Sequence, residues 1–468
     1  MRAQMNQEGE SISQAAGRFI ASMRHEDLPP AAEIAISNAL TDYAAVTILG
    51  ADEEAVRIIR GLEPVSGNPP SQQARLFFSD ATHAPRSAAL INGVAGHAHD
   101  YDDIGIAYHP AHPSVAIAPA LFAQGEVQDA SGKDMIAAYA CAYEVWSELA
   151  SRDAHPHHKR GFHPTGAFGA VAAAAGVAHL LRLDAHKAVA ALAIAASQSA
   201  GLVANFGTMT KPFHAGHAAA AGFMAAHYAR AGMAAAADIF EHQHGFLRAF
   251  SPEGAVDLQR PCHYMKHWDI IERGIGIKLY PMCYGTHRII HTLTNYAREQ
   301  DLQADEIESV VFRTAPSRVI PLVHTNPVTP LDAKFSAEFA IAQSVIARRS
   351  TLSDLSEDFL NRSDVRVLMA RVTRDLDPAL ESGFTQEPDD RLLITLKSSG
   401  RIDLPLQAPD DQALTLDRDI LWQKFRDCTS RAMEEAQAQR LFAALQGLGD
   451  MERLRDLPTW RLADEIHR

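Results

Sequence analysis

Residues 165–200 read TGAFGAVAAAAGVAHLLRLDAHKAVAALAIAASQSA, and this stretch decides the fold class. Alanine is the best helix former, and glycine has no side chain to keep a neighbouring backbone away. The stretch is typical of buried central helices, which we expect over 165–181 and 185–200. Residues 214–232 have the same composition and predict a third helix of this kind.

Outward from this centre, residues 31–49 and 134–150 keep apolar side chains at helical spacing, and Gly50 ends the first of these helices. Beyond Gly274 the pattern changes to β-branched, partly alternating segments. The further expected elements are strands over 307–313, 391–396 and 401–406, and helices over 334–348, 355–368, 421–436 and 437–448.

These elements predict a mainly α protein with a smaller α+β domain. Both ends of the chain, residues 1–270 and 412–468, are expected to form a large all-α domain. Residues 271–411 are expected to form an inserted α+β domain, because the chain returns to a helical pattern after them.

The chain has 468 residues, a formal net charge of −14 at pH 7 and a hydrophobic fraction of 47%. The composition is that of a globular protein, and the negative charge argues against nucleic-acid binding and against adsorption to anionic membranes. The four cysteines form no CxxC pair, so we expect neither a zinc ribbon nor a disulfide scaffold. The polar N-terminus lacks a signal-peptide core, and a cytoplasmic location is expected.

Residues 92–103, NGVAGHAHDYDD, and residues 109–114, HPAHPS, concentrate three carboxylates and four imidazoles in one short segment. Imidazoles beside carboxylates can divide a proton transfer between them near neutral pH. The segment therefore predicts one wall of an active site. The alternative is a polar surface loop with solvated histidines.

Two helix starts carry candidate ligands for an anion. His163 precedes a predicted helix whose first N–H groups suit a carboxylate, and the alternative is a simple N-cap by Thr165. Lys211 stands before Pro212 at the mouth of another helix, where it could anchor an anion or be an ordinary surface lysine.

Residues 278–287, KLYPMCYGTH, open a third helix of interest. Lys278 and His287 could both face an anionic ligand. The alternative is an interdomain connector with ordinary polar residues.

Two patterns raise the question of a metal. His214 and His217 lie one helical turn apart, and the alternative to a metal pair is one caged and one solvated imidazole. The motif His97-x-His99-Asp100 is similar to a ligand set of helical phosphohydrolases, but no upstream histidine stands in a helical ligand motif. We therefore expect no metal.

Taken in order, these segments resemble the MmgE/PrpD family over nearly the whole chain. The matching segments are Phe19-Ile-Ala with Leu28-Pro29, residues 92–103, His112-Pro-Ser114, Phe162-His163-Pro164, Thr210-Lys211-Pro212, Lys278-x-Tyr280-Pro281 with Thr286-His287, Lys334-Phe-Ser336 and Lys424-Phe-Arg-Asp-Cys428. The resemblance implies a homodimer of two-domain subunits with no metal and no organic cofactor. It also implies that the smaller domain is a lid and that the active site lies in the cleft between the domains.

The resemblance further implies the residues of the site. The expected catalytic residues are Asp100, His112, His163, Lys211 and His287. The expected substrate-binding residues are Lys278, Tyr280, Thr210, Asp103 and Thr286. His112 and His163 are expected to be the proton-transfer pair, with Asp100 orienting a histidine. The decarboxylase branch of the family has a threonine directly after the paired aspartates, where this chain has Ile104.

We predict a cofactor-free lyase that acts on a small di- or tricarboxylic acid through an enolate or carbanion. Such a reaction needs fixed positive charge for the carboxylates and one stereospecific proton transfer. Dehydration is favoured over decarboxylation. The alternatives are an epimerase or isomerase of a dicarboxylate such as iminodisuccinate, and a carboxylate-binding protein that has lost its activity.

Overall fold

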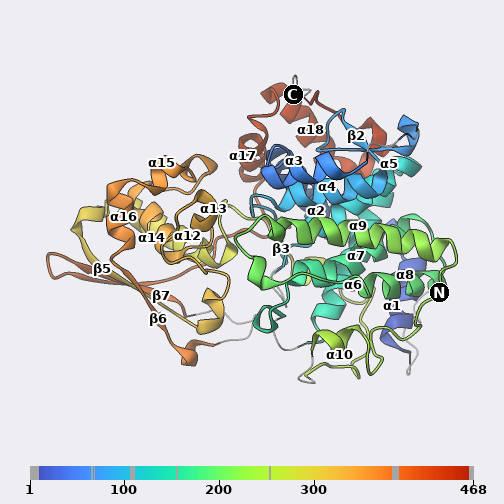
Figure 1. Ribbon diagram of the computed structural model, residues 1–468, viewed down its shortest axis with the longest axis horizontal. Helices are drawn as coiled ribbons and strands as arrows, with labels where there is room; N and C mark the ends of the chain where they lie inside the picture. The colour runs from blue at the N-terminus through green and yellow to red at the C-terminus, as the bar shows by residue number, and fades with distance from the viewer. Residues whose placement is uncertain are drawn as a thin grey trace. The chain divides into compact units, whose positions relative to one another are not determined.

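The computed structural model describes residues 10–64, 67, 69–105, 111–153, 157–251, 255–381 and 389–462. The chain forms two compact units (Figure 1): unit 1 comprises residues 1–204, 209–277 and 412–468, and unit 2 comprises residues 205–208 and 278–411. Unit 1 is helical and unit 2 contains a sheet with helices, so the mainly α class with a smaller α+β part is confirmed. The longer segment of unit 2 begins at Lys278, whereas the α+β domain is expected from residue 271, and the strand just before Lys278 pairs within unit 1.

Unit 1 consists of helices and of two short antiparallel strand pairs. The helices are α1 (Ile12–Ser22), α2 (Pro30–Leu49), α3 (Glu54–Leu62), α4 (Pro85–His97), α5 (Ser114–Gln128), α6 (Gly132–Ala150), α7 (Pro164–Leu180), α8 (Ala185–Ala196), α9 (Thr210–Arg230), α10 (Phe246–Phe250), α11 (Asp269–Glu272), α17 (Arg418–Thr429) and α18 (Glu435–Gln446). The strand pairs are β1 (Ala74–Arg75) with β2 (Thr82–His83), and β3 (Ile104–Gly105) with β4 (Ile275–Gly276).

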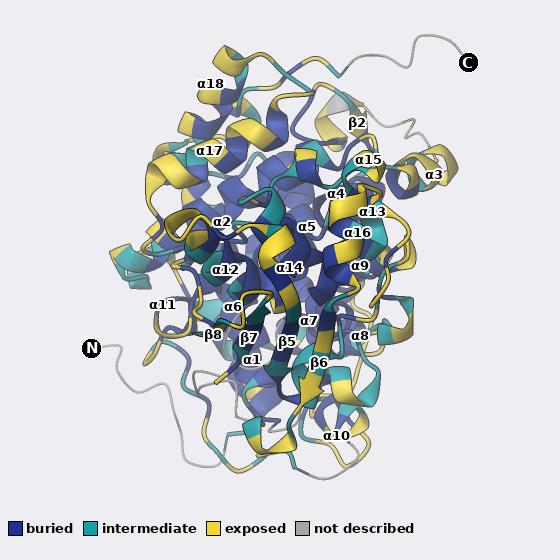
Figure 2. Cartoon of the chain, turned by 90° about the vertical axis from the view of Figure 1, so that its left-hand side faces the viewer, coloured by how far each residue is buried: buried dark blue, intermediate teal, exposed yellow. Residues whose placement is uncertain are grey.

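The helix α7 is the interior helix of unit 1 and contacts α5, α6, α8 and α9. Every residue of α7 except His179 is buried, as the dark blue ribbon in Figure 2 shows. Small residues let the backbones come close, since a Cβ added to Gly222 of α9 would lie 2.5 Å from the carbonyl oxygen of Ala170. The buried helices predicted from alanine and glycine content are confirmed.

The bounds of two central helices differ from the prediction. The helix α8 ends at Ala196 and not at Ala200, and α9 begins at Thr210, four residues earlier than expected. Pro212 lies in the first turn of α9, where its missing N–H has no intrahelical partner to lose. Lys211 is therefore part of the helix rather than of the preceding loop.

The C-terminal helices α17 and α18 pack against α2, so both ends of the chain meet in unit 1. Lys424 of α17 lies 2.6 Å from the carboxylate of Asp42 on α2, and both side chains are almost fully buried. The Lys424 ammonium also donates to the main-chain carbonyl of Tyr101 at 2.7 Å and lies over its ring. This contact joins the C-terminal helix to the acidic segment after α4.

Replacing Lys424 by methionine should lower the free energy of unfolding by roughly 3–5 kcal/mol, because it removes the positive charge 2.6 Å from the buried Asp42 carboxylate. The double variant Lys424→Met, Asp42→Asn should regain most of this loss in urea denaturation. The matched control is Arg453→Met, which breaks a more exposed ion pair of 2.8 Å with Asp129 and should cost at most about 1 kcal/mol. Equal losses in Lys424→Met and Arg453→Met would contradict the assignment.

Unit 2 is built on a four-stranded sheet with the order β6–β5–β7–β8. The strand β5 (Ile307–Thr314) runs parallel to β6 (Val372–Leu376) and antiparallel to β7 (Arg391–Leu396). The strands β7 and β8 (Arg401–Pro405) form an antiparallel hairpin. The helices of unit 2 are α12 (His287–Glu299), α13 (Pro330–Ala333), α14 (Ala337–Ile346), α15 (Glu357–Leu360) and α16 (Ser363–Met369).

The three predicted strands of unit 2 are confirmed as β5, β7 and β8. The strand β6 was not predicted, because it is an edge strand whose middle residues are polar and lack apolar alternation. The single helix predicted over 355–368 is wrong, since Asn361 ends α15 and a new helix starts at Ser363.

Within the described residues, no single helix is both long and apolar enough to cross a membrane. The helices α2 and α3 meet the criteria of length and composition only as a pair, across a bend of 85°.

Candidate active site

The turn after α4 positions the acidic segment. The helix ends at His97, and Asp100 adopts a left-handed backbone conformation with φ 53°, which aspartate tolerates better than most residues. Asp100, Asp102 and Asp103 are each 4% exposed or less. For these residues, a solvated surface loop is excluded.

Lys211 reaches from the first turn of α9 into this segment. Its ammonium donates to Oδ1 of Asp100 at 2.6 Å and to Nε2 of His97 at 2.8 Å. Because an ammonium has no lone pair, Nε2 of His97 is the acceptor and Nδ1 of His97 carries the proton. Lys211 is 4% exposed, so it is not an ordinary surface lysine.

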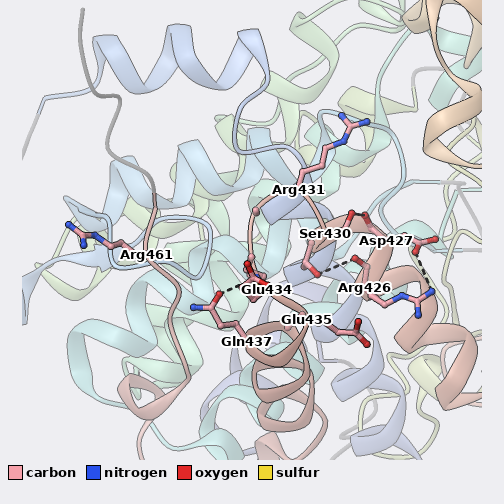
Figure 3. A pocket seen from close by; sticks show the side chains of 12 residues that line it. Arg426, Asp427, Ser430, Arg431, Glu434, Glu435, Gln437 and Arg461 are labelled. Carbon is pink, nitrogen blue, oxygen red and sulfur yellow. Dashed lines mark hydrogen bonds and ion pairs between the residues drawn. The ribbon is translucent and has the colours of Figure 1, made fainter.

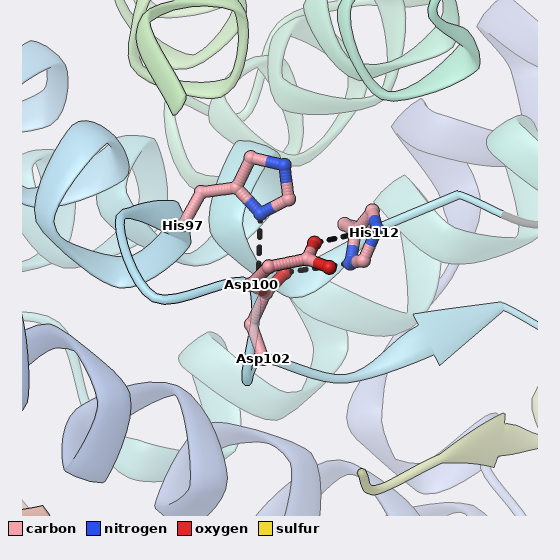
Figure 4. Close-up of side chains that lie close together, drawn as sticks. All are labelled: His97, Asp100, Asp102 and His112. Carbon is pink, nitrogen blue, oxygen red and sulfur yellow. Dashed lines mark hydrogen bonds and ion pairs between the residues drawn. The ribbon is translucent and has the colours of Figure 1, made fainter. Parts of the chain in front are cut away.

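Asp102 contacts two imidazoles (Figure 4). Its Oδ1 accepts from Nδ1 of His97 at 2.9 Å, and its Oδ2 lies 2.9 Å from Nδ1 of His112. Nδ1 of His112 also donates to the main-chain carbonyl of Asp103 at 3.0 Å, so Nε2 is the His112 nitrogen that can gain or lose a proton. That Nε2 lies 3.6 Å from Oδ1 of Asp100.

Burial and the neighbouring side chains together set the protonation state of His97 and Asp102. Burial lowers the pKa of His97 to about 3 despite the neighbouring Asp102 carboxylate, so this imidazole is neutral at neutral pH. Burial alone would raise the pKa of the Asp102 carboxyl, but His112 and His97 outweigh it and hold that pKa well below its usual range. Asp102 is therefore an ionised carboxylate that can support a positive charge on His112.

A third imidazole, His163, lies beside these two. Its ring centroid is 5.8 Å from that of His97 and 6.4 Å from that of His112. Burial, together with the charge of Lys211, holds the pKa of His163 well below its usual value, so it is neutral and able to accept a proton. His163 is itself the N-cap residue of α7, whereas the Thr165 hydroxyl accepts from the main-chain N–H of His112. The simple N-cap by Thr165 is therefore wrong.

Two groups among the described residues have a spacing that could hold a metal ion. They are His97, Asp100, Asp102 and His112, and Glu144, His263 and Asp269. In the first group, the Lys211 ammonium is within hydrogen-bond distance of His97 and Asp100, and a divalent cation there would be repelled by it. The expectation of no metal stays a prediction.

Two expected substrate-binding residues of unit 1 remain, Asp103 and Thr210, and of Asp103 it is the main-chain carbonyl that accepts from His112. Oδ1 of Asp103 accepts from the main-chain N–H of Ser114 at 3.2 Å and Oδ2 accepts from its hydroxyl, so both oxygens are committed to the start of α5. Burial and the nearby Asp42 raise the pKa of Asp103 well above its usual range. Thr210 is the exposed first residue of α9.

The remaining expected site residues belong to unit 2: Lys278, Tyr280, Thr286 and His287. Lys278 and His287 are fully buried, and Nε2 of His287 donates to the main-chain carbonyl of Tyr280 at 3.1 Å. Thr286 is the N-cap residue of α12. Burial raises the pKa of Tyr280 to about 12. The contact of these four residues with a substrate stays a prediction.

Four residues of the cluster were not among the expected site residues: His97, Asp102, His158 and His214. The signal for His97 and Asp102 was their place in the same dense segment as Asp100. His158 is half-buried, and burial with the neighbouring His112 lowers its pKa to about 3. His158 gave no signal, and His214 was noted only as one of a possible metal pair with His217, because the proximity of both residues to the site arises only from tertiary packing.

A surface pocket of about 610 Å³ lies at the corner between α17 and α18 (Figure 3). None of the expected site residues lines it. Its lining mixes arginines with glutamates, and Arg426 lies 3.8 Å from the carboxylate of Asp427 beside it. These exposed and mutually compensating charges do not define a ligand.

A second buried polar cluster surrounds His263. Nδ1 of His263 lies 2.8 Å from Glu148 and Nε2 lies 3.4 Å from Asp269. The hydrogen bond to Asp269 and that to Glu148 raise the pKa of His263 to about 9. A doubly protonated imidazole has no lone pair for a metal, so this cluster is an ion-pair network that joins α6 to α11.

Stability should depend on pH through His263. Because its folded pKa of about 9 lies above the unfolded value of about 6.5, its contribution is complete below the lower value and lost as the pH rises through the higher one. In urea denaturation, wild-type protein should exceed His263→Gln in stability at mildly acidic pH, and the difference should vanish in alkaline buffer. His267→Gln, at an exposed imidazole paired with Glu272, should show no such difference. A gap between wild type and His263→Gln that is independent of pH would refute the assignment.

The protein is therefore a mainly α protein of two units, with a buried cluster of carboxylates, imidazoles and one ammonium in its helical unit. Residues 14–259 match the model of the MmgE/PrpD N-terminal domain, and residues 280–448 match that of the MmgE/PrpD C-terminal domain. The chain is a member of the MmgE/PrpD family.

The curated relatives include cis-aconitate decarboxylases. The chain is 30% identical to that of Homo sapiens over 310 residues, which cover 63% of this chain and 62% of the relative. It is 30% identical to that of Mus musculus over 307 residues, with 63% and 61% covered. It is 24% identical to that of Aspergillus terreus over 403 residues, with 80% of each chain covered. The match thus spans less than two thirds of the two mammalian relatives.

Proposed function

We propose that this protein is a lyase that acts on a small di- or tricarboxylic acid at the cluster around Asp100. One observation carries the proposal: Oδ1 of Asp100 lies 2.6 Å from the ammonium of Lys211 and 3.6 Å from Nε2 of His112. A fixed cation and a titratable nitrogen therefore flank one point in a buried environment. Both are needed to stabilise a carbanion beside a carboxylate and to move one proton.

Each group has a defined part in this chemistry. The Lys211 ammonium stabilises the negative charge that develops on the substrate, and its effect is larger in a buried site than in water. His112 is the proton donor, because the ionised Asp102 beside its Nδ1 supports the imidazolium. His163 is the proton acceptor, because burial keeps it neutral.

Loss of CO₂ needs fewer groups than loss of water. In decarboxylation the electrons of the breaking C–C bond stay on the substrate carbon, and His112 then protonates that carbon from Nε2. In dehydration His163 first removes the proton next to the carboxylate, and His112 protonates the departing hydroxyl. The sequence favoured dehydration, but we place decarboxylation first because the relatives reported above carry that name.

Two observations keep other reactions in the proposal. Ile104 is buried in β3 and has no hydroxyl to donate where the decarboxylase branch of the family has threonine, which supports dehydration. His112 and His163 have ring centroids 6.4 Å apart, and two separate imidazoles could also remove and return a proton as an epimerase does.

The test is NMR in D₂O with the purified full-length protein, using cis-aconitate first and then a panel of saturated hydroxy di- and tricarboxylates. Release of CO₂ with one deuterium on the product supports decarboxylation, and a new double bond without loss of CO₂ supports dehydration. Exchange of the proton next to the carboxylate with inversion at that carbon, and without loss of water or CO₂, supports epimerisation. Tight binding of these acids with no change in any of them would leave a carboxylate-binding protein and refute the lyase.

The homodimer and the cytoplasmic location remain proposals drawn from the sequence. Light scattering of the purified protein tests the dimer. Expression of a fluorescent fusion in the native host tests the location.

A further inference from the structure

His163 is joined to a second buried imidazole that the proposed chemistry does not use. Nδ1 of His163 lies 3.1 Å from Nδ1 of His214 on α9, and the ring centroids are 5.3 Å apart. His163 is 1% exposed and His214 is 8% exposed, so both rings are largely shielded from bulk water. The two rings come from different helices and meet only through the packing of α7 on α9.

Only one proton can lie between the Nδ1 atoms of His163 and His214. Two protonated Nδ1 atoms at this distance would repel each other, and two lone pairs would not attract. A hydrogen bond therefore requires that one Nδ1 donates and the other accepts, which couples the tautomers of the two rings. If one ring changes its tautomer, the other has to change with it.

The surrounding backbone holds the pair in place. The main-chain N–H of His163 donates to the carbonyl of Gly201 at 3.1 Å. Gly201 has φ +119°, and a Cβ there would lie 3.2 Å from the His214 ring and 3.3 Å from Cβ of His163. The absence of a side chain at Gly201 is what leaves room for both imidazoles.

We propose that His214 is a proton relay, through which His163 exchanges its proton with the outside of the site. When Nε2 of His163 takes a proton from the substrate, the Nδ1 proton of His163 crosses to Nδ1 of His214. One positive charge thereby moves from the first ring to the second, and His214 releases it from its own Nε2. The same steps in reverse supply a proton to the substrate.

The direction of the relay follows from exposure. His163 lies next to His97 and His112, while His214 is the more exposed of the two rings. One helical turn further along α9, His217 is half-buried and its ring stacks on Phe213, whose side chain is 38% exposed. His214 thus lies between the buried cluster and a more exposed part of α9.

The pairing can be tested without any substrate. In full-length protein labelled with ¹⁵N in the histidine rings, the spectrum should show one protonated and one unprotonated Nδ1 for His163 and His214. His214→Phe should shift the ring nitrogens of His163. The matched control His217→Phe, one turn away on the same helix, should leave them unchanged. Unshifted His163 nitrogens in His214→Phe overturn the pair.

The relay itself rests on the proposed function and is tested by turnover of whichever acid the NMR panel identifies. His214→Asn places an amide near the former Nδ1 and keeps a hydrogen bond, but it has no second titratable nitrogen to pass a proton on. We expect kcat to fall at least about tenfold with little change in KM, and added imidazole to restore part of it. Full activity of His214→Asn would mean that the residue only positions His163, and would overturn the relay.

The two possible failures are distinguishable. If wild-type protein converts none of the acids, the proposed function fails and the relay fails with it, whereas the ¹⁵N spectra still decide whether the two rings are paired. If wild-type protein is active and His214→Asn is equally active, the relay alone fails.

Discussion

Replacing Lys211 by methionine should lower kcat/KM by about 10²–10³-fold, because a fixed donor to developing charge typically contributes that much. The same change should lower the free energy of unfolding by roughly 3–5 kcal/mol, since Oδ1 of Asp100 loses a buried counter-charge at 2.6 Å. Steady-state kinetics and urea denaturation of the one variant measure both effects.

The double variant Asp100→Asn, Lys211→Met separates these two effects. It removes both charges at once, so stability should return towards that of the wild type while activity stays low. Near-normal turnover in Lys211→Met would remove this lysine from the reaction. If the double variant is no more stable than Lys211→Met, the ion pair is not what holds the segment after α4.

Replacing His112 by asparagine should lower kcat by about 10²–10⁴-fold, the range expected for a positioned acid or base. The amide can still donate to the Asp103 carbonyl in place of Nδ1, but nothing replaces Nε2, the nitrogen 3.6 Å from Asp100. Because the structural hydrogen bond is kept, the protein should fold, which far-ultraviolet circular dichroism checks.

The matched control is His99→Asn. His99 comes from the same dense segment, but its imidazole lies at the partly exposed Glu53, 3.1 Å away. The same substitution there should leave kcat unchanged. Equal losses at both histidines would mean that the segment tolerates no change of shape, and the acid–base role of His112 would have no support.

Local patterns predicted the helices of unit 1 well. Alanine and glycine between 165 and 200 predicted α7 and α8, and the spacing over 31–49 predicted α2 with its end at Gly50. They failed where a local pattern was absent or misleading. The edge strand β6 has too few apolar residues to show alternation, and Asn361 divides a helix that looked continuous.

The site was predicted in part. The dense segment pointed to Asp100 and His112, and the helix starts pointed to His163 and Lys211, which the structure brings together with them. The family resemblance implies that Asp100 orients a histidine. In the structure Asp102 makes the hydrogen-bond-distance contacts with the Nδ1 atoms of His97 and His112, because the left-handed turn at Asp100 directs the next carboxylate along the chain between these two imidazoles.

Amino-acid order alone determined most of the helices and strands and the segments that carry acid–base groups, because these properties depend on neighbours within a few residues. Tertiary structure decided which of those groups meet. Lys211 contacts Asp100, which is 111 residues away in the sequence, and His214 contacts His163, which is 51 residues away. The physical reason is that only the packing of α4, α7 and α9 brings these side chains within hydrogen-bond distance. Burial there then sets which nitrogens carry protons.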